Sequence, residues 1–292
     1  MSKYLFLVNP VAGGGKALGY LDQIKATMDE HGLMYKMVTT TRPGEATTIV
    51  EDNPDCDICV AVGGDGTVNE VARGILSRGK GILAIIPGGT GNDLGKSLGI
   101  EENLDEALKK LIQCKTMEID LGKAKDKFFF NISSLGFDSE VVRHTDKIKR
   151  FVKGKAAYIL GVITALIVYR SRRVVFEVDG KHIERKATLV AVGNGRYYGG
   201  GMMILPMAKV DDGLLDVCVV KDISNLRILT LFPTIFKGDH VKYDKYVEFH
   251  TAKKIIVRAE GSYLLNIDGE LFEIKNEEVE FKLADERLSV IC

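Results

Sequence analysis

The sequence has little proline and no excess of charge of either sign, and these shortages exclude several classes of protein. Its 292 residues include 6 prolines beside 31 glycines. A low-complexity linker would be rich in both residues, so we expect the glycines to serve particular backbone positions. Forty basic residues balance forty acidic ones, which indicates no nucleic-acid partner.

Long apolar runs and completed metal motifs are also missing. The longest nearly uncharged stretch, residues 156–169, is 14 residues long, whereas a membrane-spanning helix needs about 20. The chain begins directly with a strand-like run, so no secretory signal is expected. An odd count of five cysteines fits reduced thiols in a cytoplasmic protein. Cys56 and Cys59 have C-x-x-C spacing, but no second pair completes a zinc site, and core packing is favoured.

The first part of the chain alternates between strand and helix patterns. Alternation of this kind predicts a parallel sheet with helices on both faces. Strands are expected at residues 4–8, 35–39, 57–62, 82–86 and 118–121, with helices over 16–30, from about 45, over 67–76 and twice between 86 and 118. The later part contains short strands separated by turns such as Asp212-Gly213, which predicts a β-rich second domain with mostly antiparallel pairing.

Three glycine clusters follow strands of the first part, after Val8, Val62 and Ile86. Ligands bind beyond the carboxyl ends of parallel strands, and glycine lets backbone N–H groups approach an anion closely. The sequence GGDGT at 63–67 is therefore a candidate phosphate cradle, although a tight strand-to-helix turn is the simpler alternative. Asp65 would repel phosphate, so its carboxylate suits either a metal carried by a nucleotide or the orientation of a reacting group.

Two familiar nucleotide-binding templates fail in this sequence. Residues 90–97 end like a Walker A loop, but Thr90 stands where the first glycine belongs. The glycines at 89, 91 and 95 are spaced one residue too far apart for the dinucleotide fingerprint.

The ordered set of motifs resembles the diacylglycerol kinase family of lipid kinases, in particular its soluble bacterial members. GGDGT is shared with NAD kinases, whereas the continuation VNEV at 68–71 with Gly74 favours the lipid-kinase branch. Further matching segments are residues 9–10, 87–93, 131–138, 198–202 with Pro206, 211–214 and 268–270. The resemblance covers nearly the whole chain.

The resemblance implies a Rossmann-like parallel α/β nucleotide domain over residues 1–125, like that of NAD kinases and phosphofructokinases. A β-sandwich domain would follow over 126–292, and its last segment could return to the first domain. ATP would lie in the cleft between the domains. For Thr40, a hydroxyl that caps the next helix is an open alternative. The ATP contacts implied by the resemblance are Asn9, Pro10, Val11, Ala12, Gly13, Thr40, Gly64, Asp65, Gly66, Thr67, Val68, Asn69, Glu70 and Thr90.

The resemblance also implies catalytic and metal-binding residues. Glu270 would be the general base for the lipid hydroxyl, and Asp65 would organise the catalytic Mg²⁺. The sequence around Glu270 also predicts a β-hairpin turn at Asp268-Gly269, which exists whether or not Glu270 is catalytic. A second, structural Mg²⁺ would be held by the carboxylate of Asp212 and the backbone carbonyls of Lys209 and Leu214, although an Asp-rich turn is the simpler alternative.

A basic block surrounds the apolar stretch 156–169. Between Arg143 and Arg173 nine basic residues stand against the single acid Asp146. Basic residues beside an apolar helix suit the anionic surface of a membrane, although a core helix with solvated ends is the alternative. Phe151, Tyr158 and residues 226–236 could line an acyl cleft or belong to the core.

We therefore predict an ATP- and Mg²⁺-dependent kinase that converts diacylglycerol to phosphatidic acid. It would be cytoplasmic and peripherally bound to the inner face of the membrane. Another lipid acceptor, such as phosphatidylglycerol or a sphingoid base, NAD as acceptor, and a non-catalytic nucleotide sensor are the alternatives. A homodimer remains open because no sequence feature requires one.

Overall fold

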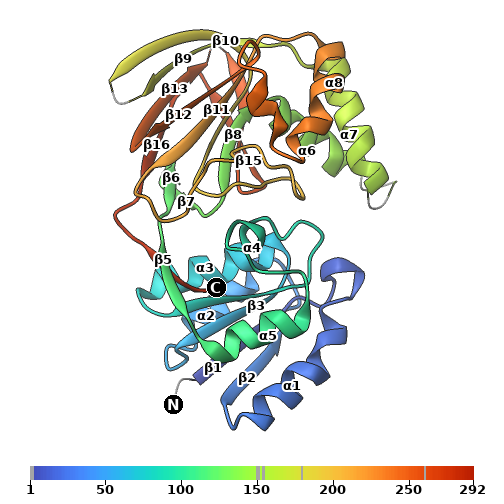
Figure 1. Cartoon of the computed structure of the whole chain (residues 1–292), viewed down its shortest axis with the longest axis vertical. Coiled ribbons are helices and arrows are strands. Elements are labelled where there is room, and N and C mark those ends of the chain that lie inside the picture. Colours follow the sequence, from blue (N-terminus) through green and yellow to red (C-terminus); the bar gives the residue numbers. More distant parts are fainter. Residues whose placement is uncertain (1–2, 149–151, 153–154, 179, 260) are drawn as a thin grey trace. The chain divides into compact units, whose positions relative to one another are not determined.

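The computed structural model describes residues 3–148, 152, 155–178, 180–259 and 261–292, without the side chains of Asp146 and residues 155–159. The chain divides into two compact units, coloured along the sequence in Figure 1. The first unit comprises Met1–Asp120, Gly199–Gly201 and Asp285–Cys292. The second comprises Leu121–Tyr198 and Met202–Ala284.

The first unit is built on a largely parallel sheet with the strand order β2-β1-β3-β4-β17-β5. Neighbours are parallel from β2 to β17, and only β5 runs antiparallel to β17. Cys56 and Cys59 are buried with the central strand, as expected from core packing. The strands are β1 (Lys3–Val8), β2 (Met34–Thr39), β3 (Ile58–Gly63), β4 (Ile82–Pro87), β5 (Thr116–Ile119) and β17 (Leu288–Ile291).

The helices of this unit follow the predicted alternation, with one late start. The helix expected from residue 16 begins at Leu21, because Gly13, Gly14 and Gly15 all have positive φ and lead into short 3₁₀ turns at Ala12–Gly14 and Leu18–Tyr20. The helices are α1 (Leu21–Glu30), α2 (Glu45–Glu51), α3 (Asp65–Arg78), α4 (Asp93–Ser97) and α5 (Leu104–Gln113).

The second unit is an antiparallel sandwich built around the long strand β10. Residues 181–187 of β10 pair with β9, and residues 189–193 pair with β8, with a register shift between Ala187 and Leu189. The two halves of β10 therefore pair with different neighbouring strands, β9 and β8. The strands are β6 (Gly122–Ala124), β7 (Lys127–Phe129), β8 (Ile132–Gly136), β9 (Arg172–Val178), β10 (Lys181–Gly193), β11 (Leu215–Lys221), β12 (Val247–Ala252), β13 (Lys254–Ala259), β14 (Ser262–Ile267), β15 (Glu270–Lys275) and β16 (Glu278–Leu283).

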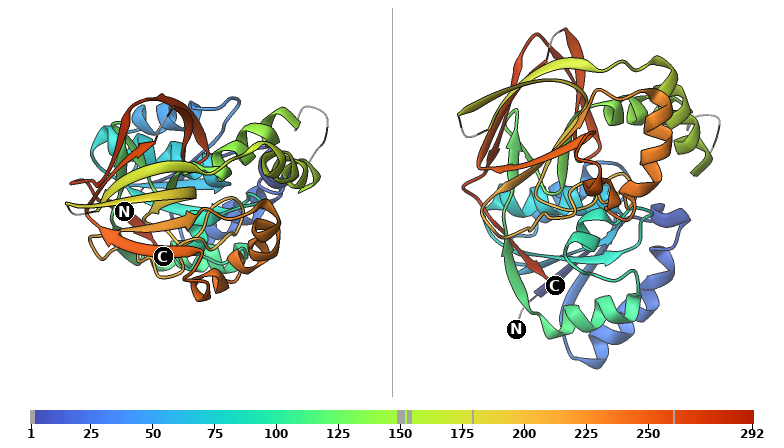
Figure 2. Two further views of the ribbon diagram at one scale, coloured as in Figure 1. Left: turned by 90° about the horizontal axis from the view of Figure 1, so that it is seen from above. Right: turned by 45° about the horizontal axis from the view of Figure 1, so that its top comes forward.

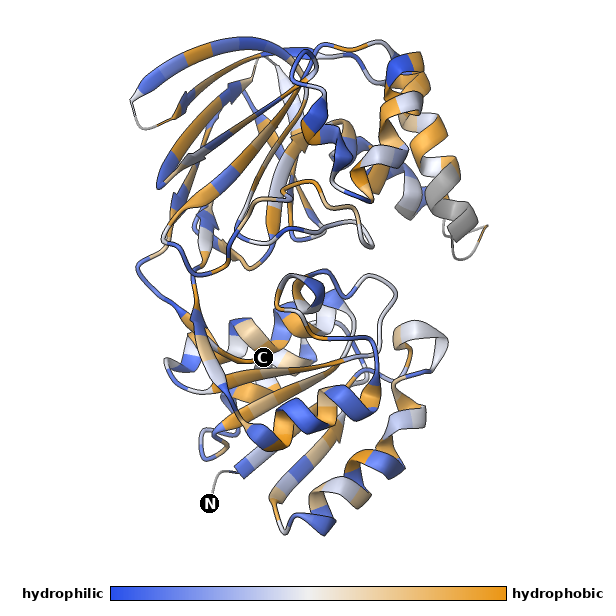
Figure 3. Ribbon diagram, viewed as in Figure 1, coloured by the Kyte–Doolittle hydropathy of each residue, from blue (hydrophilic) through white to orange (hydrophobic). Residues whose placement is uncertain are grey.

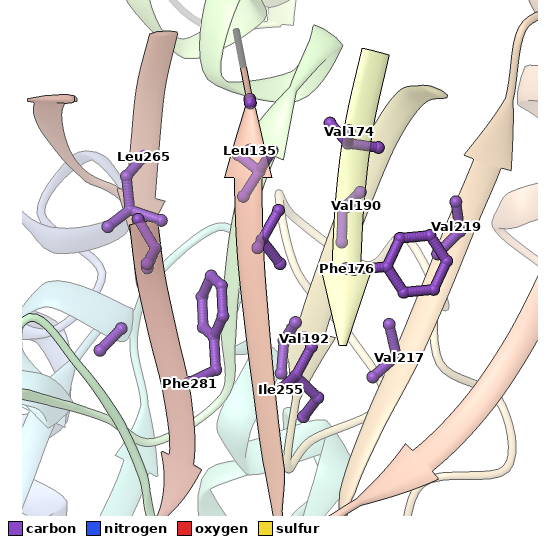
Figure 4. Close-up of a cluster of buried hydrophobic side chains, with 14 of the residues drawn as sticks. Leu135, Val174, Phe176, Val190, Val192, Val217, Val219, Ile255, Leu265 and Phe281 are labelled. Carbon is purple, nitrogen blue, oxygen red and sulfur yellow. The ribbon is translucent and has the colours of Figure 1, made fainter. Parts of the chain in front are cut away.

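Alternating side chains of these strands fill one apolar interior. Figure 4 shows Phe176, Phe281 and Val190 pointing into it from different strands, and all three are almost completely buried. Burial of this cluster is the main stabilising contribution to the second unit. The predicted fold class, a parallel α/β domain followed by a β-sandwich, is confirmed.

Three helices gather at one end of the sandwich: α6 (Phe137–Ile148), α7 (Lys155–Val168) and α8 (Asn225–Ile235) (Figures 1 and 2). Gly161 lets α7 approach α6 closely, because a Cβ there would lie 2.1 Å from Thr145 Oγ1. Among the described residues, no helix has both the length and the apolar character needed to cross a membrane.

Candidate active site

Polar residues from three neighbouring strand ends meet in the first unit. Asn9 follows β1, and its side-chain amide donates to Thr67 Oγ1 at 3.2 Å. Thr40 follows β2, and its backbone N–H donates to the carbonyl of Val8 at 2.9 Å. Three of the predicted ATP contacts are therefore brought together by the parallel sheet. The Thr40 hydroxyl faces the same carbonyl at 3.4 Å, so it does not cap α2, whose N-cap is Gly44.

The three glycine loops touch one another through their backbones. A Cβ on Gly13 would lie 2.3 Å from the carbonyl oxygen of Gly88, and one on Gly89 would lie 2.3 Å from Cα of Gly64. Any side chain at either position would push two loops apart. The N–H groups of Gly14, Gly15 and Gly88 donate to backbone carbonyls, so these bonds fix the shape of the convergence. A phosphate site here stays a prediction, which the N-terminus of α3 beside the loops favours.

Two carboxylates, those of Asp65 and Asp93, lie beside each other at this convergence. The backbone N–H of Asp93 donates to Asp65 Oδ1 at 2.6 Å. Asp93 in turn accepts the N–H groups of Gly201 at 2.7 Å on Oδ1 and of Gly200 at 2.9 Å on Oδ2. Asp93 is thus held at both oxygens and itself fixes one oxygen of Asp65.

Both carboxyls resist ionisation. Burial raises the pKa of Asp93 to about 6, and the neighbouring charge of Asp65 adds to the shift. Burial also raises the pKa of Asp65, against the N–H groups of residues 92–94, which favour its anion. Two confined negative charges of this kind fit a divalent cation, because a cation offsets both the burial and the mutual repulsion.

Sequence reasoning gave Asp93 no role, although residues 87–93 stood among the matching motifs. Gly200 and Gly201, whose N–H groups hold the Asp93 carboxylate, lie 107 and 108 positions downstream of it. Lys96 was also missed: its ammonium donates to the carbonyl of Gly91 at 2.7 Å and pairs with Glu102 at 3.1 Å. The Walker-A-like ending Gly95-Lys96-Ser97 and the position of a cation beside a glycine loop were the local signals that could have indicated Lys96.

The remaining predicted ATP contacts have differing environments. The carboxylate of Glu70 accepts the N–H groups of Gly44 at 2.8 Å and Ala46 at 3.1 Å, so it stabilises the N-terminus of α2. Val68 is buried, whereas Val11 and Thr90 are exposed. Their contact with a nucleotide remains a prediction, as it does for Pro10, Ala12, Gly13, Gly64, Gly66 and Asn69.

Glu270 lies in the second unit, at the start of β15, directly after the predicted hairpin turn. Asp268 and Gly269 form that turn with φ of 46° and 95°, and Ile267 pairs with Glu270. The Asp268 carboxylate accepts three consecutive N–H groups, from Phe130 at 2.6 Å, Asn131 at 3.2 Å and Ile132 at 3.0 Å. The hairpin that presents Glu270 is therefore fixed to the chain before β8.

A buried acid lies beside this hairpin. Asp138, in the first turn of α6, accepts the hydroxyl of Ser134, which pairs with Asn266 across β8 and β14. Burial raises the pKa of Asp138. Asn266 in turn accepts the N–H of Gly269 at 2.8 Å. Polar contacts thus lead from the buried acid to the turn before Glu270.

The predicted structural metal loop contains two neighbouring carboxylates. Asp212 accepts the N–H of Leu214 at 3.2 Å, which forms the expected Asp turn. Burial raises the pKa of nearby Asp216 to about 6, and Asp212 adds to the shift. This oxygen-rich donor set fits Mg²⁺. Among the described residues no cluster of three His, Cys, Asp or Glu side chains could hold a metal, so either predicted site would depend on backbone or substrate oxygens as well.

Comparisons with known proteins agree with this arrangement. The model of the diacylglycerol kinase catalytic domain matches residues 3–124, and that of the YegS C-terminal NAD kinase beta sandwich-like domain matches 131–291. A diacylglycerol kinase of Mycobacterium tuberculosis is 32% identical over 270 residues, covering 89% of this chain and 86% of that protein. One of Bacillus subtilis is 27% identical over 274 residues, covering 92% and 90%.

Solved structures extend the likeness to three dimensions. The crystal structure of a diacylglycerol kinase from Bacillus anthracis is 26% identical, with a TM-score of 0.77 over 99% of this chain and 96% of that one. A second structure from the same organism is 28% identical and reaches a TM-score of 0.80 with the same coverage. The chain therefore belongs to the diacylglycerol kinase family of lipid kinases.

Proposed function

We propose that this lipid kinase transfers the γ-phosphoryl group of ATP to the free hydroxyl of diacylglycerol, giving phosphatidic acid and ADP. The observation that carries the proposal is the fixed carboxylate of Asp65 where the three glycine loops converge. The names of the relatives from M. tuberculosis and B. subtilis support diacylglycerol as the acceptor.

The first unit would bind ATP. The N–H groups of the glycine loops and the N-terminus of α3 would take the phosphates, and Asn9, Thr40 and Thr67 would supply polar contacts beside them. Lys96 would add a positive charge next to Gly91. Asp65 would hold Mg²⁺, with Asp93 fixing its orientation. When bound, Mg²⁺ neutralises charge on the phosphates.

The second unit would supply the base. Glu270 would accept the proton of the lipid hydroxyl as the oxygen forms its bond to phosphorus and the bond to the ADP oxygen breaks. The three N–H groups held by Asp268 keep the hairpin rigid, so Glu270 would be positioned before the substrate arrives. The loop of Asp212 and Asp216, with the carbonyls of Lys209 and Leu214, would hold the structural Mg²⁺.

The substrate lies in a membrane, so we infer peripheral association with its anionic cytoplasmic face. The basic block supports this, since Arg170 and Arg173 are exposed. Lys149, Arg150, Lys153 and Phe151 lie outside the described residues, as do the side chains of Lys155 and Tyr158.

The test is phosphate transfer from labelled ATP to a panel of acceptors in mixed micelles: diacylglycerol, phosphatidylglycerol, sphingosine and NAD. We expect transfer to diacylglycerol, reduced about 10²–10⁴-fold by Glu270→Gln, the usual range for loss of a general base. Glu273→Gln, an exposed glutamate on the same strand, is the control. Phosphate appearing on NAD and on no lipid would overturn the proposal, and unchanged turnover in Glu270→Gln would remove the assignment of the base.

A further inference from the structure

We propose that the exposed apolar face of α7 and α8 inserts into the surface of an anionic bilayer and so docks the enzyme on its substrate. This α7–α8 face consists of Leu160, Ile163, Ile167, Leu226, Leu229 and Phe236, with exposed fractions from 42% at Leu160 to 74% at Leu226. The choice of a bilayer as partner rests in part on the proposed function, because the acceptor is a membrane lipid.

The exposed side chains form a stripe on each helix. On α7 they recur at 160, 163 and 167, while Val162, Ala165 and Leu166 between them are buried. On α8 they recur at 226 and 229 and continue to Phe236 directly after the helix, while Ile228 and Leu231 are buried. Each helix is therefore apolar on its outer side as well as on its packed side.

The two stripes belong to one surface. Val162 and Leu166 of α7 share an apolar cluster with Ile228 of α8, and the side chain of Asn225 donates to the carbonyl of Leu166. Figures 1 and 2 show the helices side by side, and Figure 3 shows that both are hydrophobic along most of their length. The packed sides hold α7 and α8 next to each other, and from this we place their exposed side chains on one surface.

Exposed large hydrophobic side chains elsewhere are scattered in the described part of the chain. Examples are Met34 on β2 and Met207 in a loop, at 52% and 55% exposure. Single exposed apolar residues are ordinary on protein surfaces, whereas a contiguous patch marks an interaction site. We infer that the α7–α8 face is such a patch, because its six exposed apolar side chains come from two helices that pack against each other.

Charge favours an anionic bilayer over a protein partner. Neither helix sequence contains an acidic residue. Arg170 lies at the C-terminus of α7, Lys237 directly follows Phe236, and Arg227 of α8 stacks on the ring of Tyr246 at 5.3 Å. Apolar side chains with cations at the edges are typical of helices that lie in the interface of anionic lipids.

The first test is co-sedimentation with vesicles of three parts phosphatidylcholine to one part phosphatidylglycerol. Because four aliphatic side chains leave the apolar phase, Ile163→Ser, Ile167→Ser, Leu226→Ser and Leu229→Ser combined should weaken partitioning at least about tenfold. The double variant Met34→Ser, Met207→Ser is the matched control and should bind as the natural chain does. Binding of the fourfold variant equal to that of the natural chain would overturn the proposal. The proposal would also be overturned if, without vesicles, the natural chain were a dimer and the fourfold variant a monomer, because the face would then be a dimer interface.

A second test uses the fact that the chain contains no tryptophan. Ile167→Trp places a single reporter on the α7–α8 face, whose emission should shift to shorter wavelength with these vesicles and be quenched by brominated lipid. Met34→Trp should show neither change, and a response equal to that of Ile167→Trp would contradict the proposal. Neither co-sedimentation nor fluorescence depends on phosphate transfer. If the chain bound vesicles but lacked diacylglycerol kinase activity, the proposed function would be contradicted and the membrane-docking proposal would stand.

Discussion

Asp93 connects the glycine loop of residues 199–201 to the carboxylate of Asp65. Its carboxylate accepts two N–H groups from Gly200 and Gly201, and its own N–H fixes Asp65. Protonation would replace one carboxylate acceptor by a hydroxyl that faces one of those N–H groups, and the hydrogen bond from Gly200 or Gly201 to Asp93 would be lost. The state of Asp93 should therefore govern activity at acidic pH.

The raised pKa of Asp93 predicts that activity is lost at an unusually high pH for a carboxyl group. Since burial raises the pKa of Asp93 to about 6, the logarithm of kcat/KM should fall as pH drops below about 6, rather than near the ordinary carboxyl value. Asp93→Asn cannot titrate there, so its activity should be lower at neutral pH and its acid limb should move. A limb near pH 4 in the natural chain, or one unmoved in Asp93→Asn, would contradict this role. The measurement is steady-state kinetics with a soluble short-chain diacylglycerol.

The carboxylates of Asp212 and Asp216 lead to a prediction about metal removal. Their close negative charges oppose folding unless a cation binds. If millimolar Mg²⁺ exceeds the dissociation constant about tenfold, linkage gives about 1.4 kcal/mol, or a rise in Tm of about 3 °C over the value in EDTA. In Asp212→Asn that difference should disappear, while Asp211→Asn, one residue away, should keep it. An equal Mg²⁺ response in all three proteins would locate the effect elsewhere.

For helices and strands, the features that could be predicted are those that depend on residues close together in the sequence. The parallel strands, the loops after them and the Asp268-Gly269 hairpin follow from buried runs and turn residues close in sequence. The hydrogen bonds that hold Asp93 could not be predicted, because their donors, Gly200 and Gly201, are distant in the sequence. The delayed start of α1 was missed because three glycines with positive φ replace the first helical turn. A return of the last segment to the first domain was considered, but no strand was predicted at β17, because this strand is short and follows the other unit's last strand.

The contact between glycine loops predicts opposite effects for two glycines. Gly89→Ala places a Cβ 2.3 Å from Cα of Gly64, so backbone must move, and unfolding free energy should fall by at least about 2 kcal/mol with a higher KM for ATP. Gly66→Ala meets nothing within 4 Å on α3, so stability should rise by about 0.5–1 kcal/mol. Urea unfolding of the two variants measures this difference. A tolerated Gly89→Ala would mean that the loops do not touch.

At the scale of the whole molecule, the balanced count of forty bases and forty acids conceals an uneven distribution. Nine of the bases lie between residues 143 and 173 beside a single acid. Membrane attraction of such a block depends on anionic lipid and is screened by salt over about 10 Å at 0.1 M. The net charge of zero therefore does not imply indifference to charged surfaces.

The uneven distribution of basic residues should make activity at a membrane depend on lipid charge and on salt. Activity on diacylglycerol in vesicles should rise with the fraction of phosphatidylglycerol and fall severalfold when salt is raised from 0.05 to 0.5 M, because each well-placed cation contributes about 1 kcal/mol that salt screens. Activity on short-chain diacylglycerol in neutral micelles, measured in parallel, should change little. Arg170→Gln with Arg173→Gln should reduce the salt dependence, whereas Lys254→Gln with Arg258→Gln, on β13 and already paired with Glu280 and Glu278, should not. Equal salt sensitivity in vesicles and micelles would place the effect in nucleotide binding instead.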